Sequence, residues 1–218
     1  MGKVIAIDGP SGAGKGTIAK LLAGKLGFSY LDTGALYRAA ALALREKEIN
    51  PEDSDEKLKN TLSVTDVSFK NGKVSLNGKD VSEEIRTAEM GHYSSVFSAR
   101  KVVRDFLLDI QRNASLNADL VAEGRDMTTV VFPDAWKKFY LDASVEERAK
   151  RRYLQMKEKG INITESEAKK DVVERDVRDS GRDIAPLRKA DDAVLIDSSS
   201  MTIDKVLENI MKVVRTSH

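Results

Sequence analysis

A glycine-rich segment near the N-terminus constrains the fold of this chain more than any other feature. It lies between a short apolar run at residues 4–7 and a helical pattern at residues 18–26. Glycines let backbone N–H groups turn inward around phosphate oxygens, the helix N-terminus adds partial positive charge, and Lys15 adds a full charge. A plain glycine-rich turn is the alternative, but a strand, a loop, a Gly-Lys pair and a helix coincide here. We therefore predict a phosphate-binding loop made by Gly9, Pro10, Ser11, Gly12, Ala13, Gly14, Lys15, Gly16 and Thr17.

The end of this loop departs from the common pattern. Gly16 stands where a serine or threonine linked to Mg²⁺ is usual, and Thr17 follows one residue later. This Gly-Lys-Gly-Thr ending resembles the nucleoside monophosphate kinases rather than GTPases or helicases. The resemblance implies that Thr17 acts on Mg²⁺ through water. The chain contains neither an Asn-Lys-x-Asp nor an Asp-x-x-Gly tetrapeptide, which argues against a GTPase switch.

Five short apolar stretches alternate with helical patterns along the chain. Each stretch ends in polar or glycine residues, and the alternation is typical of a parallel sheet covered by helices. We predict an α/β fold of the P-loop NTPase type, in which helices flank a five-stranded parallel sheet. The predicted strands are at residues 4–7, 28–31, 120–122, 138–141 and 193–196.

The composition excludes several classes of protein. The 218 residues suffice for one substantial domain, and 36 Lys and Arg residues balance 35 Asp and Glu residues. A chain without a large positive excess is not typical of proteins that bind nucleic-acid polymers or membrane surfaces. The absence of cysteine excludes disulfides, thiolate metal sites and cysteine nucleophiles. Because the N-terminal apolar run is too short for a signal peptide or a membrane helix, we expect a cytoplasmic protein.

Residues 64–82 interrupt the alternation of strands and helices. Apolar and polar residues alternate here around Asn71-Gly72, and Asn77-Gly78 follows at once. Asn-Gly is a strong signal for a tight turn between antiparallel strands. We therefore predict a small antiparallel sheet inserted in the parallel α/β fold.

Two later helices are predicted on either side of a hinge-like loop at residues 160–163. Ser144 with Glu147, and Thr164 with Glu167, have the spacing of capping boxes that begin helices. Gly160 can end the first of these helices. The region therefore consists of two helices joined by a short loop.

Arginine is concentrated in this same region. Seven of the 15 arginines lie between residues 148 and 188, and this stretch has a net charge of +4. A single arginine on a helix is often only part of a solvated face, but a set on both sides of a hinge-like loop suggests a lid that closes over phosphates. We expect Arg175, Arg178 and Arg182 to share roughly one helix face. The seven residues are Arg148, Arg151, Arg152, Arg175, Arg178, Arg182 and Arg188.

Three further segments accompany the phosphate-binding loop: DTGALYR at residues 32–38, EGRDMTTVVFP at 123–133 and ERDVRDSGR at 174–182. Together they make nearly the whole chain resemble the bacterial cytidylate kinase family. The resemblance implies a monomer that transfers the γ-phosphoryl group of ATP to CMP or dCMP with Mg²⁺. It also implies a core at about residues 1–32, 114–147 and 183–218, an acceptor-binding subdomain at 33–113 and a lid at 148–182.

The resemblance further implies roles for individual residues. Thr33 presents a hydroxyl to the acceptor, and Asp179 holds its ribose. The residues that grip the acceptor phosphate or neighbouring groups are Arg38, Arg104 and Arg125. Those that read cytosine or its surroundings are Ser95, Asp126 and Arg182. The catalytic set toward the phosphates of ATP consists of Lys15, Arg148, Arg152 and Arg175.

The chemistry of cytosine favours the role of Asp126 independently. Cytosine has a donor amine at C4, from which a carboxylate can accept, whereas uracil has a carbonyl there. Asp126 could instead cap a helix or pair with Arg125. Two other functions remain open: a kinase for another small acceptor, such as UMP, AMP or a hydroxylated metabolite, and a nucleotide-binding regulator without turnover.

Overall fold

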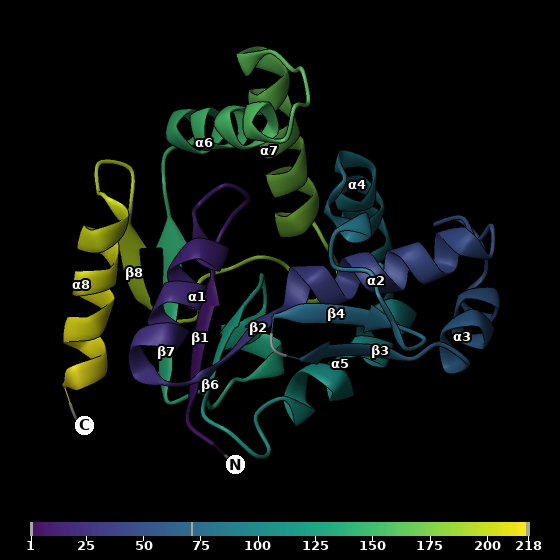
Figure 1. Cartoon of the computed structure of the whole chain (residues 1–218), viewed down its shortest axis with the longest axis horizontal. Coiled ribbons are helices and arrows are strands. Elements are labelled where there is room, and N and C mark those ends of the chain that lie inside the picture. Colours follow the sequence, from purple (N-terminus) through teal and green to yellow (C-terminus); the bar gives the residue numbers. More distant parts are fainter. Residues whose placement is uncertain (1, 71, 217–218) are drawn as a thin grey trace.

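A five-stranded parallel sheet forms the centre of the molecule (Figure 1). The computed structural model describes residues 2–70 and 72–216. The strand order is β2-β6-β1-β7-β8, and every neighbouring pair is parallel. The predicted sheet is therefore confirmed, and each strand end lies within about one residue of its expected place. The strands are β1 (Val4–Asp8), β2 (Ser29–Asp32), β6 (Leu120–Glu123), β7 (Lys137–Asp142) and β8 (Val194–Asp197).

Helices cover both faces of this sheet, because successive strand residues point to opposite faces. In β1, Ile5 and Ile7 belong to one buried cluster, and Val4 and Ala6 belong to another on the opposite face. Burial on both faces explains why β1 is an unbroken apolar run up to its last residue. The first face is covered by α1 (Lys15–Leu26) and α8 (Ile203–Arg215), and the second by α2 (Thr33–Glu46) and α5 (Lys101–Asn113).

The register of the sheet brings two loops together. β1 pairs with β6 so that Ile7 lies opposite Glu123. Directly beyond this pair, the Gly124 N–H donates to the Ile7 carbonyl at 3.0 Å. The loops after β1 and β6 therefore leave the sheet side by side at its carboxyl edge, which is where open α/β sheets bind ligands.

A second, antiparallel sheet lies beside the main one (Figure 1). β4 pairs antiparallel with both β3 and β5, as predicted for residues 64–82. Asn77 and Gly78 adopt positive φ angles of 50° and 81°, as a tight hairpin turn requires. Asn71 of the other predicted turn lies outside the described residues. This region contains α3 (Asp55–Ser63), β3 (Val67–Lys70), β4 (Lys73–Leu76), β5 (Lys79–Asp80), η1 (Glu84–Arg86) and α4 (Ala88–Phe97).

Two helices, α6 (Val145–Glu158) and α7 (Glu165–Ser180), pack against each other beyond the carboxyl edge of the sheet (Figure 1). We call them the α6–α7 pair. Thr164 forms the predicted capping box with Glu167, and Gly160 has a left-handed φ of 70° after the end of α6. Among residues 2–70 and 72–216, no helix combines the length and the apolar character needed to cross a membrane.

The capping box predicted at the start of α6 is only half formed. The Ser144 hydroxyl accepts from the Glu147 N–H at 3.3 Å, as expected. The Glu147 carboxylate, however, accepts from Arg151 Nε at 3.1 Å instead of turning back to Ser144. The Ser144 N–H donates to the Ser199 hydroxyl at 2.8 Å. A partner distant in the sequence therefore replaces half of the predicted box.

Two other local predictions also need correction. α7 ends at Ser180, so Arg182 follows the helix and does not share its face with Arg175 and Arg178. A five-residue π-helix, η2 (Met127–Val131), follows β6 and was not predicted. Because π-helical turns are rare and are frequent at functional sites, η2 directs attention to the loop that precedes it.

Candidate active site

Glycines shape the loop between β1 and α1. A Cβ atom at Gly9 would lie 1.9 Å from the Leu141 carbonyl oxygen, and one at Gly12 would lie 2.9 Å from the Arg148 carbonyl oxygen. Gly14 has a φ of 92°, which favours glycine, and it directly precedes α1. Only glycine therefore lets the loop pass this close to β7 and α6.

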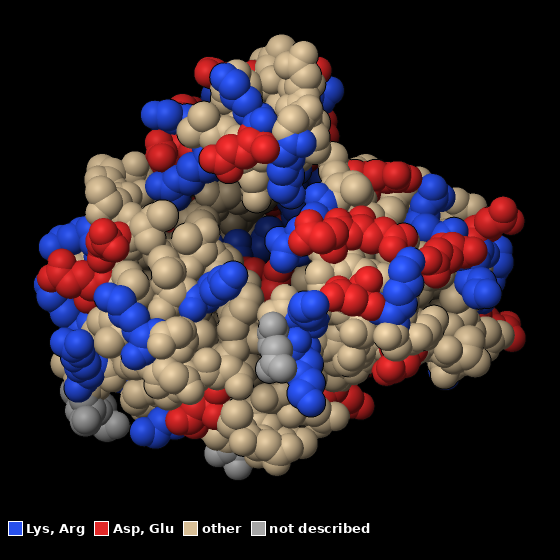
Figure 2. Space-filling view, viewed as in Figure 1, with Lys and Arg blue, Asp and Glu red and all other residues tan. Residues whose placement is uncertain are grey.

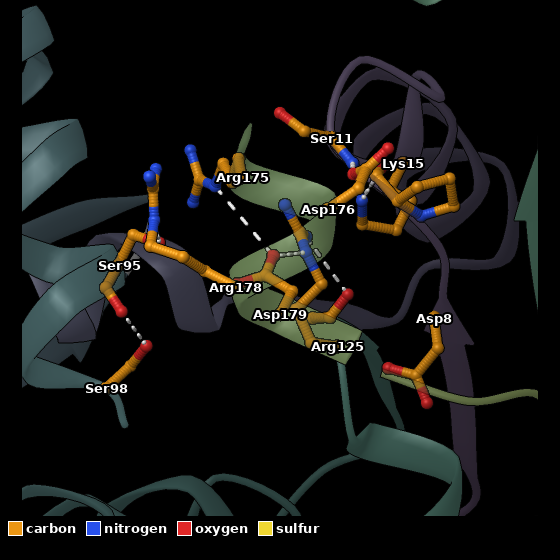
Figure 3. Close-up of polar contacts among 12 residues, drawn as sticks. Asp8, Ser11, Lys15, Ser95, Ser98, Arg125, Arg175, Asp176, Arg178 and Asp179 are labelled. Atoms are coloured by element: carbon orange, nitrogen blue, oxygen red, sulfur yellow. Dashed lines mark hydrogen bonds and ion pairs between the residues drawn. The ribbon is translucent and has the colours of Figure 1, made fainter. Parts of the chain in front are cut away.

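Lys15 is buried at the base of this loop. Its Nζ donates to the Pro10 carbonyl at 2.8 Å, which folds the side chain back under the loop (Figure 3). Burial lowers the pKa of Lys15, and the charge of Arg125 lowers it further, whereas Glu123 raises it. A bound anion would favour the charged form of Lys15. The side chain is thus poised to gain from a phosphate in the loop.

A cavity of about 940 Å³ opens beside the loop. Figure 2 shows it as a hollow that contains Lys and Arg side chains. Residues 11–17 of the predicted loop line it, whereas Gly9 and Pro10 do not. The cavity also brings together every residue predicted for the acceptor: Thr33, Arg38, Ser95, Arg104, Arg125, Asp126, Asp179 and Arg182.

Positive charge dominates the wall of this cavity. Its basic residues outnumber its acidic ones, and such an excess in a concave site attracts anionic ligands. The basic residues are Lys15, Lys20, Arg38, Arg86, Arg104, Arg125, Arg151, Arg152, Arg175 and Arg182. The acidic residues are Asp32, Glu123, Asp126, Glu147, Glu158 and Asp179.

Asp179, near the end of α7, gathers three arginines. Its carboxylate accepts from Arg125 Nε at 2.7 Å and from Arg182, and Arg175 Nε lies 3.9 Å away (Figure 3). Burial acts to raise the pKa of Asp179, but the three arginines lower it below its ordinary value. One carboxylate among three guanidinium groups leaves positive charge available to a ligand.

Three arginines of the cavity have a buried donor without a partner. Within the described part of the chain, the Nε atoms of Arg38, Arg175 and Arg182 make no hydrogen bond. Buried donors are almost always paired in folded proteins, because an unpaired one loses its bonds to water. An oxyanion in the cavity could accept from them. These three atoms are the clearest structural sign of an anionic ligand.

Asp126 forms a buried ion pair with Arg104. Arg104 also donates to the Ser98 carbonyl at 3.0 Å, and its guanidinium lies 5.5 Å from the centre of the Tyr37 ring. The Asp126 side chain caps no helix. The alternative pairing with Arg125 does not occur, because Arg125 turns to Asp179. Asp126 is therefore held at the cavity wall from the side of α5.

The structure places Arg148 outside the cavity. Its Nε donates to the Ala143 carbonyl at 2.9 Å, its Nη1 donates to the Ser11 carbonyl at 3.1 Å, and it pairs with Asp176. Asp176 in turn accepts from the Ser11 N–H at 3.1 Å. Arg148 thus links the α6–α7 pair to the loop at residues 9–17, and it does not line the cavity. Arg152 and Arg175, the other two arginines predicted to act on the phosphates of ATP, do line the cavity.

Asp8, to which the sequence analysis gave no role, is a fully buried carboxylate at the end of β1. It accepts from the Met127 N–H at 2.9 Å and from the N–H and hydroxyl of Thr128 at 2.7 and 2.6 Å. Burial raises the pKa of Asp8 to about 6. These bonds fix the start of η2 and hence the backbone directly after Asp126. The available signal was a carboxylate that ends an apolar strand.

Glu123 and Asp32 also had no assigned role, and they lie opposite each other at the ends of β6 and β2. A Cβ atom at Gly16 would lie 3.4 Å from Glu123 Oε1, and Thr17 follows in the same cavity wall. Burial and the charge of Asp32 raise the pKa of Glu123. Two carboxylates and a hydroxyl suit Mg²⁺, which binds few protein oxygens together with ligand phosphates. Among the described residues, no three His, Asp or Glu side chains form a metal site by themselves.

Comparison with known proteins finds relatives over nearly the whole chain. The family model for cytidylate kinase matches residues 5–216. The cytidylate kinase of Thermodesulfovibrio yellowstonii is 51% identical over 216 residues, which cover 97% of each chain. That of Thermosipho melanesiensis is 50% identical over 211 residues, which cover 97% of this chain and 96% of the relative.

A solved structure of an uncharacterized protein from Eubacterium ventriosum covers 99% of both chains with a TM-score of 0.53 and 14% identity. At this low identity, the likeness supports the fold alone. The sequence relatives carry the assignment, because they combine about half identity with nearly complete coverage of both chains. This protein accordingly belongs to the cytidylate kinase family.

Proposed function

We propose that this protein transfers the γ-phosphoryl group of ATP to CMP or dCMP, giving ADP and CDP or dCDP. One observation carries the proposal: a single cavity joins a phosphate-binding loop to a second group of arginines around Asp126 and Asp179. Family membership and the printed names of the relatives support a nucleotide kinase with these substrates.

On the donor side, the protein holds charge in place. The loop N–H groups and the N-terminus of α1 bind the terminal phosphates of ATP, and Lys15 adds its ammonium. Arg152 and Arg175 add positive charge that stabilises the transition state. The α6–α7 pair, which carries both arginines, acts as a lid that excludes water and so prevents hydrolysis of ATP.

On the acceptor side, arginines position the nucleophile. A phosphate oxygen of the acceptor is already a competent nucleophile, so the site needs correct alignment more than a general base. Arg38 and Arg125 hold the acceptor phosphate, and the unpaired Nε of Arg38 supports this role. Asp179 lies within the same arginine group and accepts from the ribose hydroxyls.

Specificity for cytosine comes from polar groups in a closed pocket. Asp126 accepts from the C4 amine of cytosine, and its burial with Arg104 supports a fixed, charged acceptor. Uracil presents a carbonyl in the same place, which leaves the carboxylate unpaired. A pocket that leaves buried polar groups unpaired can reject the wrong base strongly.

Mg²⁺ fits the carboxylates beside the loop. Thr17, Glu123 and Asp32 would hold it, through water in the case of Thr17. When bound, the ion neutralises charge on the phosphates of ATP. Burial and the charge of Asp32 raise the pKa of Glu123, whereas the charge of Lys15 lowers it, and a bound cation would lower it further.

A substrate panel tests the proposal. The initial rate of ADP formation is measured with MgATP and each of CMP, dCMP, UMP, dTMP, AMP and shikimate, and we expect the highest kcat/KM with CMP and dCMP. A preference for AMP or for a non-nucleotide would contradict the assignment of Asp126 to base recognition. Nucleotide binding without turnover would favour a regulator. The Lys15→Ala variant controls for a contaminating kinase.

A further inference from the structure

Arg178 makes a contact between two parts of the molecule that no role above explains. From α7, its Nε donates to the hydroxyl oxygen of Ser95 on α4 at 3.2 Å (Figure 3). The two residues are 83 positions apart. Arg178 itself does not line the cavity, whereas Ser95 does. Arg178 therefore supports Ser95 from behind the cavity wall.

Ser95 differs from its two serine neighbours in the wall. The Ser94 hydroxyl donates to the Gly91 carbonyl at 3.0 Å, and the Ser98 hydroxyl donates to the Ser95 carbonyl at 2.9 Å. Both hydroxyl protons are therefore satisfied by backbone carbonyls of α4. The Ser95 hydroxyl has no acceptor among the described residues, although Ser95 is only 3% exposed. Its proton is thus free for a ligand.

The contact with Arg178 fixes the polarity of Ser95. A guanidinium group has only donors, so it always occupies an acceptor position of the hydroxyl oxygen. Its positive charge also turns the hydroxyl proton away from it. Arg178 thus takes one of the two lone pairs of the Ser95 oxygen, and its charge makes the O–H a stronger donor than the remaining lone pair is an acceptor. We expect Ser95 to present this O–H to the cavity.

We propose that Arg178 is a positioning residue for base recognition, which holds the Ser95 hydroxyl as a donor and so favours cytosine over uracil. This inference rests on the proposed function. At N3, cytosine has an acceptor and uracil has an N–H donor. A fixed donor complements the first and opposes the second, whereas a free hydroxyl could rotate to accept from uracil.

The position of Arg178 also links base recognition to the donor side. Two positions earlier on α7, Asp176 binds the Ser11 N–H of the phosphate-binding loop. The α6–α7 pair also contacts the acceptor side, where Lys159 Nζ, just after α6, donates to the Arg86 carbonyl of η1 at 3.2 Å. ATP bound in the loop would hold α7 in this contact through Asp176, and with it Arg178 against Ser95. Linkage then requires that ATP and CMP strengthen each other's binding.

The test is a double-substitution cycle. The ratio of kcat/KM for CMP to that for UMP is measured at saturating MgATP for wild type, R178M, S95A and the double variant. R188M is the matched control, because Arg188 is an exposed arginine outside the cavity. R178K keeps the charge and a donor. Thermal unfolding checks that each variant is folded.

We expect R178M to lower the CMP to UMP ratio about tenfold, the size of one lost hydrogen bond. R178K should recover part of the ratio, R188M should leave it unchanged, and R178M should have no further effect in the S95A background. R178M should also reduce the factor by which a nonhydrolysable ATP analogue tightens CMP binding in calorimetry.

Two results would overturn the inference while wild type prefers CMP: an unchanged ratio in folded R178M, or an equal fall of the ratio with and without Ser95. If wild type uses UMP as well as CMP, the proposed selectivity for cytosine fails, and if it phosphorylates neither, the proposed function itself fails. Either result is distinguishable because it needs no variant.

Discussion

The donor side and the acceptor side of the cavity hold positive charge by different means. On the proposed donor side, the backbone of residues 11–17 lines the cavity, and Lys15 is the one cationic side chain within this segment. On the acceptor side, arginines are paired with buried carboxylates, as in Arg104 with Asp126 and Arg125 with Asp179. The donor side depends on glycines that let the backbone pass close to its neighbours, and the acceptor side depends on carboxylates that compensate the charge of buried arginines.

This difference decides what each side tolerates. A backbone surface depends on contacts such as that of Gly9 with β7, where no side chain fits. A paired cluster depends on each partner, because removal of one carboxylate leaves buried arginines without compensation. We therefore expect substitutions on the donor side to affect turnover first, and those on the acceptor side to affect stability and selectivity.

The largest effect is expected from Lys15→Ala. Loss of the one loop cation should lower kcat about 10³-fold, or about 4 kcal/mol of barrier. The fold should persist, because the loop is shaped by glycines. Steady-state rates with MgATP and CMP measure the effect, and circular dichroism with a thermal melt checks the fold. A kcat near that of wild type would show that the loop does not act as a donor site.

Asp179→Asn should act on stability instead. Three arginines lose their shared carboxylate, and we expect the free energy of unfolding to fall by about 3 kcal/mol in urea titrations. Asp105→Asn is the control, because Asp105 pairs with Lys101 in an exposed position. An equal loss in both variants would contradict the balanced-charge interpretation.

Asp8 lies between the two sides, where it joins the end of β1 to the start of η2. The pH dependence of stability tests whether its carboxylate is buried. Burial raises its pKa from 3.8 to about 6 in the folded state. Between these values the folded protein keeps a proton that the unfolded chain releases, so stability falls as the pH rises from 4 to 6. Relative to Asp8→Asn, wild type should lose up to about 3 kcal/mol in all, most of it between pH 4 and 6, with no further loss above about pH 7.

Urea unfolding of both proteins at several pH values measures this difference. The other carboxylates titrate alike in the two proteins and cancel. A difference that stays constant from pH 4 to 7 would show that Asp8 keeps an ordinary pKa in the folded protein.

Asp126→Asn should have the smallest of these effects. It should lower selectivity and, because Arg104 loses its buried partner, also lower the free energy of unfolding. An amide can turn either its oxygen or its nitrogen toward the base, so the ratio of kcat/KM for CMP to that for UMP should fall about 10²-fold. The KM for ATP should change little. If the ratio stays constant in this variant, Asp126 does not read the base.

Features made by one contiguous segment could be predicted from the sequence, and features made by residues far apart in the chain could not. The five strands and the loop were predictable because each is a contiguous segment with its own pattern. The position of Arg148 was not, because its partner Ser11 lies 137 residues away. Asp8 was missed for the same reason, since its donors lie 119 and 120 residues along the chain. Apart from the chemical argument for Asp126, the acceptor residues could be assigned only by resemblance, because they come from five separate segments of the chain.

The pairing of β1 with β6 has a further consequence for the reaction itself. The loop proposed to hold the donor leaves β1 after Asp8, and the loop that carries Arg125 and Asp126 leaves β6 opposite it. A shift of this pairing by one residue would displace one loop by about 3.3 Å. That step equals the whole distance between reacting atoms in a near-attack geometry, about 3–3.5 Å. The register of β1 and β6 thus determines the distance between the two loops, and with it the distance over which a phosphoryl group is transferred.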